Sequence, residues 1–352
     1  MAPDGLRPGA RVTRAGGRPR WLRLLVALAL LVAAFVYGVL PSLVTAKNDV
    51  HLLREASIWL LGLAFVLEIA SIVTYTGLTR AILPSGVAVG WWTQLAIDLV
   101  GNGASHALPG GGATASALRY RLMRSAGIGP SASMATSAMQ PTISDLALGG
   151  CYIAGVLTVL PRLRGQPAVL LTAAGSALVL VVAVVGSVLA ARREDPGGGQ
   201  VRTGRSRLVT RFGVLWSRLR TDVVDLLRDD VRTRRAAGFA TANWLFDAAC
   251  LWVCLWAYGD RVSPGLVLTA YGFACLLGLL PLTPGGLGVI EGTLIPLLVA
   301  FGVTGPVAVL GTLTWRLFQF WLPVPAAGVC YLGLKLGGRL EPTHAADTRA
   351  QG

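Results

Sequence analysis

Long apolar runs separated by short polar stretches alternate along most of this chain. Many of them match the roughly 20 residues that an α-helix needs to cross about 30 Å of hydrocarbon. The pattern predicts an all-α, polytopic membrane protein with a single transmembrane domain over residues 21–336. The expected spans are 21–40, 57–79, 87–108, 131–160, 168–191, 239–258, 265–280 and 307–336.

Composition supports lipid as the solvent of this chain. Of its 352 residues, 54% are hydrophobic and only 14% are charged, too few to cover a water-soluble protein of this size. The five cysteines fall inside apolar segments, where a thiol packs as a small hydrophobe. We therefore expect no disulfide framework, no metal site and no cofactor.

Arginines set the expected orientation in the membrane. The basic tail 1–20 and the loop 192–237 carry most of the net charge of +14, which we assign to the cytoplasmic side rather than to nucleic-acid binding. Both termini are thus expected in the cytoplasm, with residues 337–352 as a disordered tail. Arginine-rich composition with two lysines favours a bacterial inner membrane. Run 21–40 also resembles a signal peptide, but its full membrane length favours a retained anchor.

The basic loop has a helical apolar pattern of its own. Apolar residues recur there at steps of three and four, namely Leu208, Phe212, Leu215, Leu219, Val223 and Leu226. This spacing predicts an amphipathic helix on the cytoplasmic leaflet, with its arginines near anionic lipid headgroups. Docking on a partner helix is the alternative.

Two passages of the chain repeat at a constant interval. Pro109-Gly110-Gly111 with Gly127-Ile128 corresponds to Pro284-Gly285-Gly286 with Gly302-Val303. The pattern predicts a duplication, with repeat one over about 57–160 and repeat two over about 238–336. Arginines follow only the first passage closely, which predicts that the two repeats are inverted in the membrane.

Each Pro-Gly-Gly is predicted to break a helical hairpin that re-enters the membrane. Broken helices of this kind surround the substrate site in many secondary transporters, because unwound backbone is tolerated only inside protein or beside water. The six residues of the two turns are our candidate gates. An ordinary tight turn is the alternative for each.

Several polar side chains lie inside apolar segments, where charge is costly and usually faces a cavity. They are Glu68, Asp98, Asn102, His106, Asp145, Asn243, Asp247, Glu291, Arg316 and Gln319. We pair Arg316 with Glu291: the guanidinium would hold a lipid phosphate, and Glu291 would counter it when no lipid is bound. The alternative is a structural ion pair.

Other polar residues suggest a second contact region. Arg119 follows the first Pro-Gly-Gly and is expected to approach a phosphate from the cytoplasmic side, or else to act only as a topology signal. Asp98 and Asn102 lie one turn apart and, with Asp145, are expected to line a polar track. His106 is expected to be a hydrogen-bonding cap.

The stretch Leu280-Pro281-Leu282-Thr283-Pro284-Gly285-Gly286-Leu287-Gly288-Val289-Ile290-Glu291-Gly292, followed by Gly302-Val303 and Arg316, resembles a known family. This is the lysylphosphatidylglycerol synthase transmembrane-domain family, also called flippase-like. The stretch from Asn102 to Ile128 is similar to the family's upstream motif. It departs from that motif at 113–116, where many members carry a glutamate, and at Gln140-Pro141, where they carry an arginine.

The resemblance implies a membrane domain that moves aminoacylated phosphatidylglycerol between leaflets, without the aminoacyl-transfer domain of larger members. A lipid translocase is therefore the leading hypothesis, and we expect no enzymatic activity. The alternatives are a scaffold or regulator of a lipid-synthesis enzyme and an intramembrane lipid-modifying transferase. Expected partners are membrane phospholipids, with a separate lipid synthase and a homo-oligomer left open.

Overall fold

The computed structural model describes residues 54–84, 86–87, 89–107, 111–162, 230–279 and 283–336, and within these ranges it is helical with no strand. Four of the described helical stretches are long and apolar enough to cross a membrane: 58–82, 130–159, 231–257 and 305–336. They coincide with expected spans, so the all-α, multi-pass membrane architecture is confirmed. The expected spans 21–40 and 168–191 lie outside the described residues.

The described helices fall into two series. The first comprises α4 (Ile58–Ile82), α5 (Trp91–Ala107), α6 (Gly111–Ser125) and α7 (Pro130–Val159), with a short 3₁₀ turn, η3 (Leu160–Arg162). The second comprises α10 (Asp230–Ala257), α11 (Pro264–Gly278), the 3₁₀ turn η4 (Pro284–Gly286), α12 (Val289–Ala300), α13 (Gly305–Arg316), the π-helical η5 (Leu317–Trp321) and α14 (Pro323–Leu336).

Helix boundaries recur at the interval seen in the sequence. The end of α4 and the end of α10 are as far apart in the chain as the two Pro-Gly-Gly passages, and so are the starts of α7 and α13. The packing partners correspond too, because α5 packs on α14 as α11 packs on α7. The helical order thus follows the predicted duplication. The inverted orientation of the repeats and the re-entry of their hairpins stay predictions.

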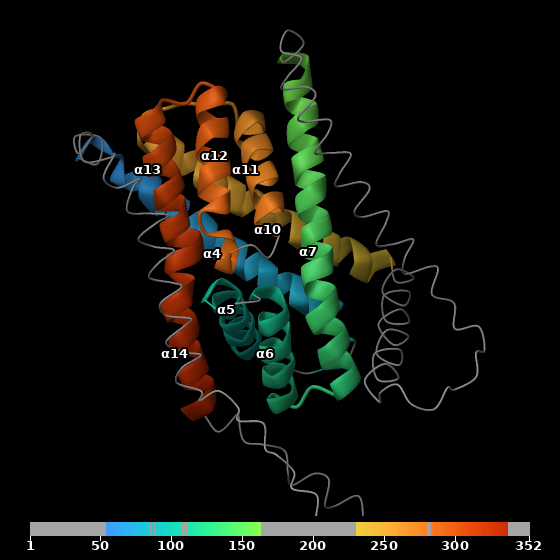
Figure 1. Cartoon of the computed structure of the whole chain (residues 1–352). Helices are drawn as coiled ribbons and strands as arrows, with labels where there is room; N and C mark the ends of the chain where they lie inside the picture. Colours follow the sequence, from blue (N-terminus) through green and yellow to red (C-terminus); the bar gives the residue numbers. More distant parts are fainter. Residues whose placement is uncertain are drawn as a thin grey trace, which may run out of the picture.

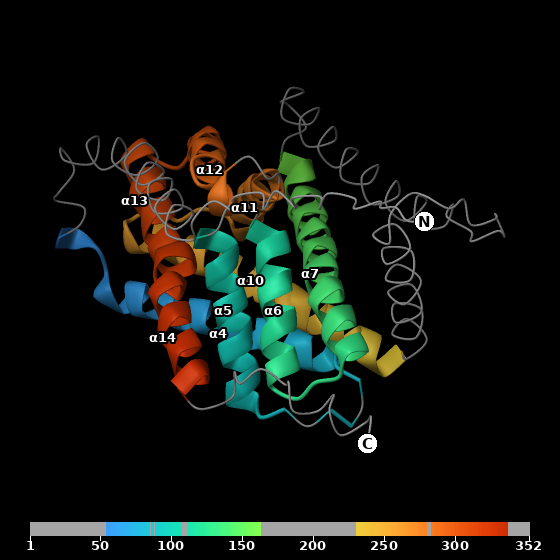
Figure 2. The ribbon, with the colours of Figure 1, turned by 60° about the horizontal axis from the view of Figure 1, so that its bottom comes forward.

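Helices α4 and α10 form the centre of the molecule. They lie side by side and run across the other helices, with α7 and α14 on opposite sides of α5 and α6 (Figures 1 and 2). Ser71 and Asn243 join the two helices: the Asn243 Nδ2 donates to the Ser71 carbonyl at 3.0 Å and to its Oγ at 2.7 Å. Such polar contacts stabilise helix association in lipid, where the hydrophobic effect gives no driving force between helices.

Small residues bring the flanking helices close. A Cβ added at Gly103 of α5 would lie 2.4 Å from the Ala327 Cβ of α14, and one added at Gly272 of α11 would lie 2.9 Å from the Tyr152 Cβ of α7. Backbones in membranes approach this closely where one helix presents glycine. The α5–α14 and α11–α7 interfaces therefore both depend on a glycine that lets the two helices pack closely.

Helix α10 begins earlier than the sequence pattern predicts. The expected span starts at 239, but the helix starts at Asp230, within the predicted basic loop. Arg232 explains the extension, because its Nη2 donates to the carbonyls of Ile82 at 2.7 Å and Leu83 at 3.2 Å at the end of α4. A cation at a helix C-terminus satisfies carbonyls that have no partner in the helix. The rest of the amphipathic loop, 192–229, lies outside the described residues.

The last expected span is one helical stretch with a π-helical turn in its middle. The Leu322 amide donates to the Leu317 carbonyl at 2.9 Å, a step of five residues. Pro323 follows and has no amide hydrogen to continue an α-helical ladder, which accounts for the widened turn. The turn starts immediately after Arg316.

Candidate functional site

One cavity of about 780 Å³ lies between the two helical series. Its walls come from α4, α5, α6 and α7 on one side and from α10, α11, η4, α12, α13 and η5 on the other. Pockets that hold small molecules have volumes of about 300–1,000 Å³ and carry a few converging polar groups. Of the residues predicted to bind substrate, all but Glu291 line this cavity, namely Asp98, Asn102, Arg119, Asp145 and Arg316.

Arg316 and Glu291 form the ion pair expected from the sequence. The Arg316 Nε donates to the Glu291 Oε1 at 2.6 Å, and both side chains are buried. The other Glu291 oxygen accepts the Gly288 amide at 2.7 Å, where α12 begins. Glu291 therefore caps its own helix and binds Arg316 at the same time.

The second Pro-Gly-Gly forms the turn between α11 and α12. Gly285 and Gly286 have φ angles of +57° and +69°, a region that glycine enters without steric cost. A Cβ on Gly285 would lie 2.3 Å from the Phe320 ring. The Gly285 carbonyl also accepts Arg316 Nη2 at 3.4 Å. The break in the helix is as predicted, and it places unwound backbone at the cavity wall.

Arg119 and Asp98 form a second buried ion pair, which the sequence did not predict. The Arg119 Nε lies 3.3 Å from the Asp98 Oδ1, and the exposed fractions of the side chains are 3% and 1%. The Nη2 donates to the Tyr75 hydroxyl at 3.4 Å, and the guanidinium lies 5.6 Å from the centre of that ring. Arg119 is therefore buried beside a carboxylate, and its role as a topology signal stays an alternative.

Two amides and a glycine shape this second pair. Gln94 donates to the Asp98 Oδ2 at 3.1 Å and Gln140 donates to the Oδ1 at 3.4 Å. Gly101 leaves room for the guanidinium, because a Cβ there would lie 2.7 Å from the Arg119 Nη2. Asp98 therefore accepts two hydrogen bonds from buried amides. The Arg119 Nε, in contrast, has no hydrogen-bond partner among the described residues.

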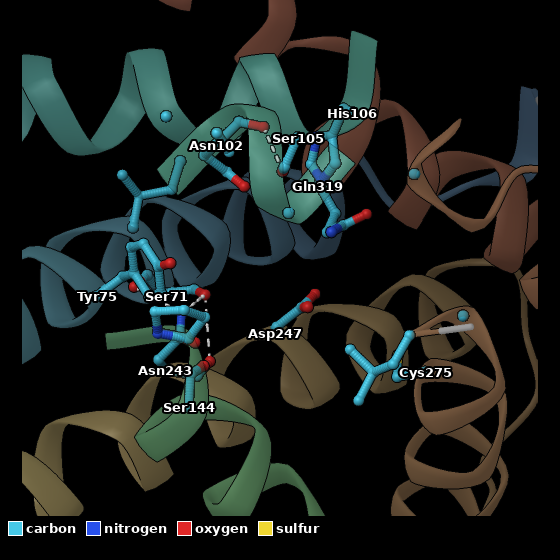
Figure 3. Close-up of a pocket in the computed structure, with 18 of the residues that line it drawn as sticks. Ser71, Tyr75, Asn102, Ser105, His106, Ser144, Asn243, Asp247, Cys275 and Gln319 are labelled. Atoms are coloured by element: carbon cyan, nitrogen blue, oxygen red, sulfur yellow. Dashed lines mark hydrogen bonds between the residues drawn. The ribbon is translucent and has the colours of Figure 1, made fainter. Parts of the chain in front are cut away.

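Neutral polar groups complete the lining. Figure 3 shows Asn102, Ser105 and Gln319 on one side of the cavity and Ser71, Asn243 and Ser144 on the other. The Ser144 oxygens accept the Trp244 indole N–H, at 2.7 Å for the carbonyl and 3.0 Å for the hydroxyl.

His106 packs its ring against an aromatic side chain. The ring stacks on Phe320 with 4.6 Å between centroids, and its buried Nδ1 has no hydrogen-bond partner among the described residues. The role of a hydrogen-bonding cap stays a prediction, because residues 108–110 beside His106 lie outside the described residues. Of the first candidate gate, Gly111 begins α6, whereas Pro109 and Gly110 lie outside the described residues.

Residues that the sequence analysis did not select contact one of the two ion pairs, and one of them, Tyr75, lines the cavity. Tyr75, Gln94 and Gln140 surround the Arg119–Asp98 pair. Gln94 could have been found, since it precedes Asp98 by four residues and so shares its helix face. Glu68 and Asp247 were noted as intramembrane acids, and both line the cavity.

Comparisons with known proteins agree with the architecture. A family model described as the lysylphosphatidylglycerol synthase TM region matches residues 20–327. Two proteins from Methanothermobacter thermautotrophicus, each named UPF0104 membrane protein, are similar to part of the chain. One is 30% identical over 100 residues, covering 28% of this chain and 29% of the relative. The other is 32% identical over 94 residues, covering 26% and 28%. The match thus spans less than a third of either relative.

Proposed function

The chain belongs to the lysylphosphatidylglycerol synthase transmembrane family, and we propose that it is a lipid translocase. It would move an anionic or modified phospholipid, or a lipid-linked intermediate, between the leaflets of a bacterial inner membrane, with both termini in the cytoplasm. The observation that carries the proposal is the presence of two buried arginines, one from each helical series, at a single cavity.

Arg119 is the group best suited to receive a phosphate. It makes one hydrogen bond in the part of the chain that the structure describes, and its buried Nε, 3.3 Å from the Asp98 Oδ1, has no hydrogen-bond partner there. Guanidinium groups bind phosphate through two parallel N–H donors, and such charge-assisted bonds are among the stronger ones. A phosphate at this position would satisfy donors that the protein itself leaves unused.

Asp98 then acts as the counter-ion of the lipid-free state. It holds Arg119 at 3.3 Å, and it keeps the two amide donors of Gln94 and Gln140 if Arg119 turns toward a phosphate. The buried carboxylate is therefore not left unsatisfied during exchange, which avoids the usual cost of separating a buried pair. The arrangement favours reversible capture of an anion.

Arg316 supports the proposal differently from what the sequence suggested. All three of its nitrogens donate to protein acceptors, those of Glu291, Gln319 and Gly285. A guanidinium has five N–H donors, so two remain for a ligand. We assign Arg316 the role of holding the broken-helix turn in place, with a secondary contact to the headgroup.

The test is leaflet exchange in liposomes that contain the purified chain and labelled phosphatidylglycerol or its lysyl form. Arg119→Ala is expected to reduce exchange roughly tenfold to a hundredfold, because a hydrogen bond to a charged group contributes about 1.5–3 kcal/mol. Arg121→Ala is the matched control, since Arg121 is exposed on the same helix. Exchange equal to protein-free liposomes for every headgroup tested would sink the proposal.

That negative outcome would shift the interpretation to a scaffold for a lipid-synthesis enzyme. The amphipathic segment 205–235 is the predicted docking element for such a role. A deletion of this segment that abolishes co-purification with a synthase would support the scaffold. A change in the mass of a lipid incubated with the purified chain would instead indicate a transferase.

A further inference from the structure

Two buried acids lie on the two central helices, and the proposed lipid contacts do not use them. Glu68 belongs to α4 and Asp247 to α10, and the exposed fraction of each residue is 5%. Both line the cavity, and Figure 3 shows the Asp247 side chain pointing into it. The two helices are antiparallel, with Arg232 bonded to Ile82 and Asn243 bonded to Ser71, so the next turn of each brings Asp247 to the level of Glu68.

A hydrogen bond between two carboxyl groups requires a proton on one of them. Ionised carboxylates have acceptors only, and two of them this close would repel each other. Side by side in a buried site, Glu68 and Asp247 are therefore expected to hold one proton between them. Acids buried in a membrane domain commonly mark proton or ion pathways, which makes this pair a candidate for such a role.

The surroundings indicate which acid carries the proton. Asp247 accepts hydrogen bonds from the Tyr271 hydroxyl at 2.7 Å and from the Trp315 indole N–H, so donors already stabilise its charge. The Oε2 of Glu68 is buried and accepts no hydrogen bond from any described residue. A proton on Glu68 removes an uncompensated charge and supplies the donor for Asp247. Glu68 is thus the carrier and Asp247 its anchor.

Each neighbouring helix contributes groups that face the pair. Thiol and phenol groups come from α10 and α11, and a guanidinium comes from α13. They are Cys250, Cys254, Tyr271, Cys275 and Arg316. Arg316 is the only permanently charged member of this set and acts on Asp247 through space.

Helix α13 links the acid pair to the lipid site. Trp315 donates to Asp247, and the next residue, Arg316, binds Glu291 and the Gly285 carbonyl of the turn. Loss of the proton would place a second negative charge beside these consecutive residues. The charge balance around Arg316 and the broken-helix turn therefore depends on whether the pair is protonated.

We propose that Glu68 and Asp247 form a proton-binding site that couples lipid exchange to a proton gradient. The inference rests on the proposed translocase function. One proton from water binds the Glu68 carboxylate and later returns to water on the other side, so one O–H bond forms and the same bond breaks. No other reactant is needed.

The first experiment reads the proton directly. Infrared difference spectroscopy of the full chain in phosphatidylglycerol vesicles would follow the band of protonated carboxyl groups as pH changes. We expect Glu68→Gln to abolish the titrating band, Asp247→Asn to shift the pH at which it appears, and Glu55→Gln, at an exposed acid, to leave it unchanged. An unchanged band in both cavity variants would overturn the proposal, whatever the transport activity.

The second experiment measures exchange with and without an imposed pH gradient. The wild type should be accelerated by the gradient, whereas in Glu68→Gln the ratio of exchange with the gradient to exchange without it should fall to one. Exchange that ignores the proton gradient, or responds only to sodium, would overturn the proposal and leave the translocase standing. Absence of exchange under every condition would instead refute the translocase, and the infrared titration would still decide proton binding.

Discussion

The two buried arginines of the cavity sit in similar ion pairs but are held differently. Arg316 contacts Glu291 at 2.6 Å and has an acceptor for each nitrogen, whereas Arg119 contacts Asp98 at 3.3 Å and makes one long hydrogen bond. Equal charge and equal burial therefore do not give equal roles. The first arrangement fixes a turn, and the second leaves a cation available to a ligand.

The predicted duplication does not extend to the residues of the two pairs. In the first repeat, the positions that correspond to Glu291 and Arg316 are Ser116 and Pro141, so the first half lacks this pair. Conversely, the position in the second repeat that corresponds to Arg119 is Leu294, which is fully buried. Each half thus contributes one arginine from a different place, and the cavity is chemically asymmetric although its helices correspond.

Removing Glu291 should have the largest effect on stability. Glu291→Ala leaves Arg316 as an uncompensated buried charge, a change that typically costs about 3–5 kcal/mol. Unfolding in mixed detergent micelles, followed by tryptophan fluorescence, would measure the loss. The double variant Glu291→Leu with Arg316→Met should recover part of it, since both charges then disappear. A single variant as stable as the wild type would contradict the role of a structural pair.

Removing Arg119 should cost less stability than removing Glu291. In Arg119→Met the Asp98 carboxylate keeps its bonds from Gln94 and Gln140, so we expect a loss of about 1–3 kcal/mol. The same unfolding assay, run in parallel, gives the comparison. If Arg119→Met proves the more destabilising of the two, Arg119 is not the loosely held partner described above.

Gly101→Ala should separate binding from stability. The added Cβ would lie 2.7 Å from the Arg119 Nη2 and must displace the guanidinium, while alanine gains up to about 1 kcal/mol of helix propensity. We expect near-native unfolding together with reduced lipid exchange. Gly150→Ala is the control, because nothing lies within 4 Å of a Cβ at that helical position. Equal exchange in both variants would disprove the steric link to Arg119.

The smallest effect is expected for Tyr75→Phe. The variant loses one 3.4 Å hydrogen bond to Arg119 but keeps the aromatic ring beneath the guanidinium. A bond that long contributes little, so the unfolding free energy should change by no more than about 0.5–1 kcal/mol. A larger loss in the unfolding assay would mean that Arg119 is held more firmly than the distances indicate.

The sequence predicted the helical architecture well, because lipid imposes strict rules on span length and backbone satisfaction. It also predicted the pair of Arg316 and Glu291, since a cation about ten residues into an apolar segment needs a nearby acid. The boundary of α10 was missed because apolar counting ignores a capping arginine. Arg232 adds helix by satisfying carbonyls of another segment, which periodicity cannot show.

The pairing of Arg119 with Asp98 was not predictable for a related reason. Asp98 was grouped with Asn102 by helical spacing, but its cation comes from the next helix and reaches it past Gly101. Likewise, Glu68 and Asp247 lie far apart in the chain and reach the same level only because α4 packs alongside α10. Contacts between separate helices depend on crossing geometry, which one sequence does not specify.

The contact of Arg232 with the end of α4 limits how the two halves can move. Sliding α10 along α4 by one helical turn, about 5.4 Å, would take the guanidinium away from the Ile82 and Leu83 carbonyls and leave them without it. A rotation about this contact would preserve both bonds. An opening of the cavity that keeps this end of α4 capped must therefore rotate α10 about the Arg232 contact rather than translate it along α4.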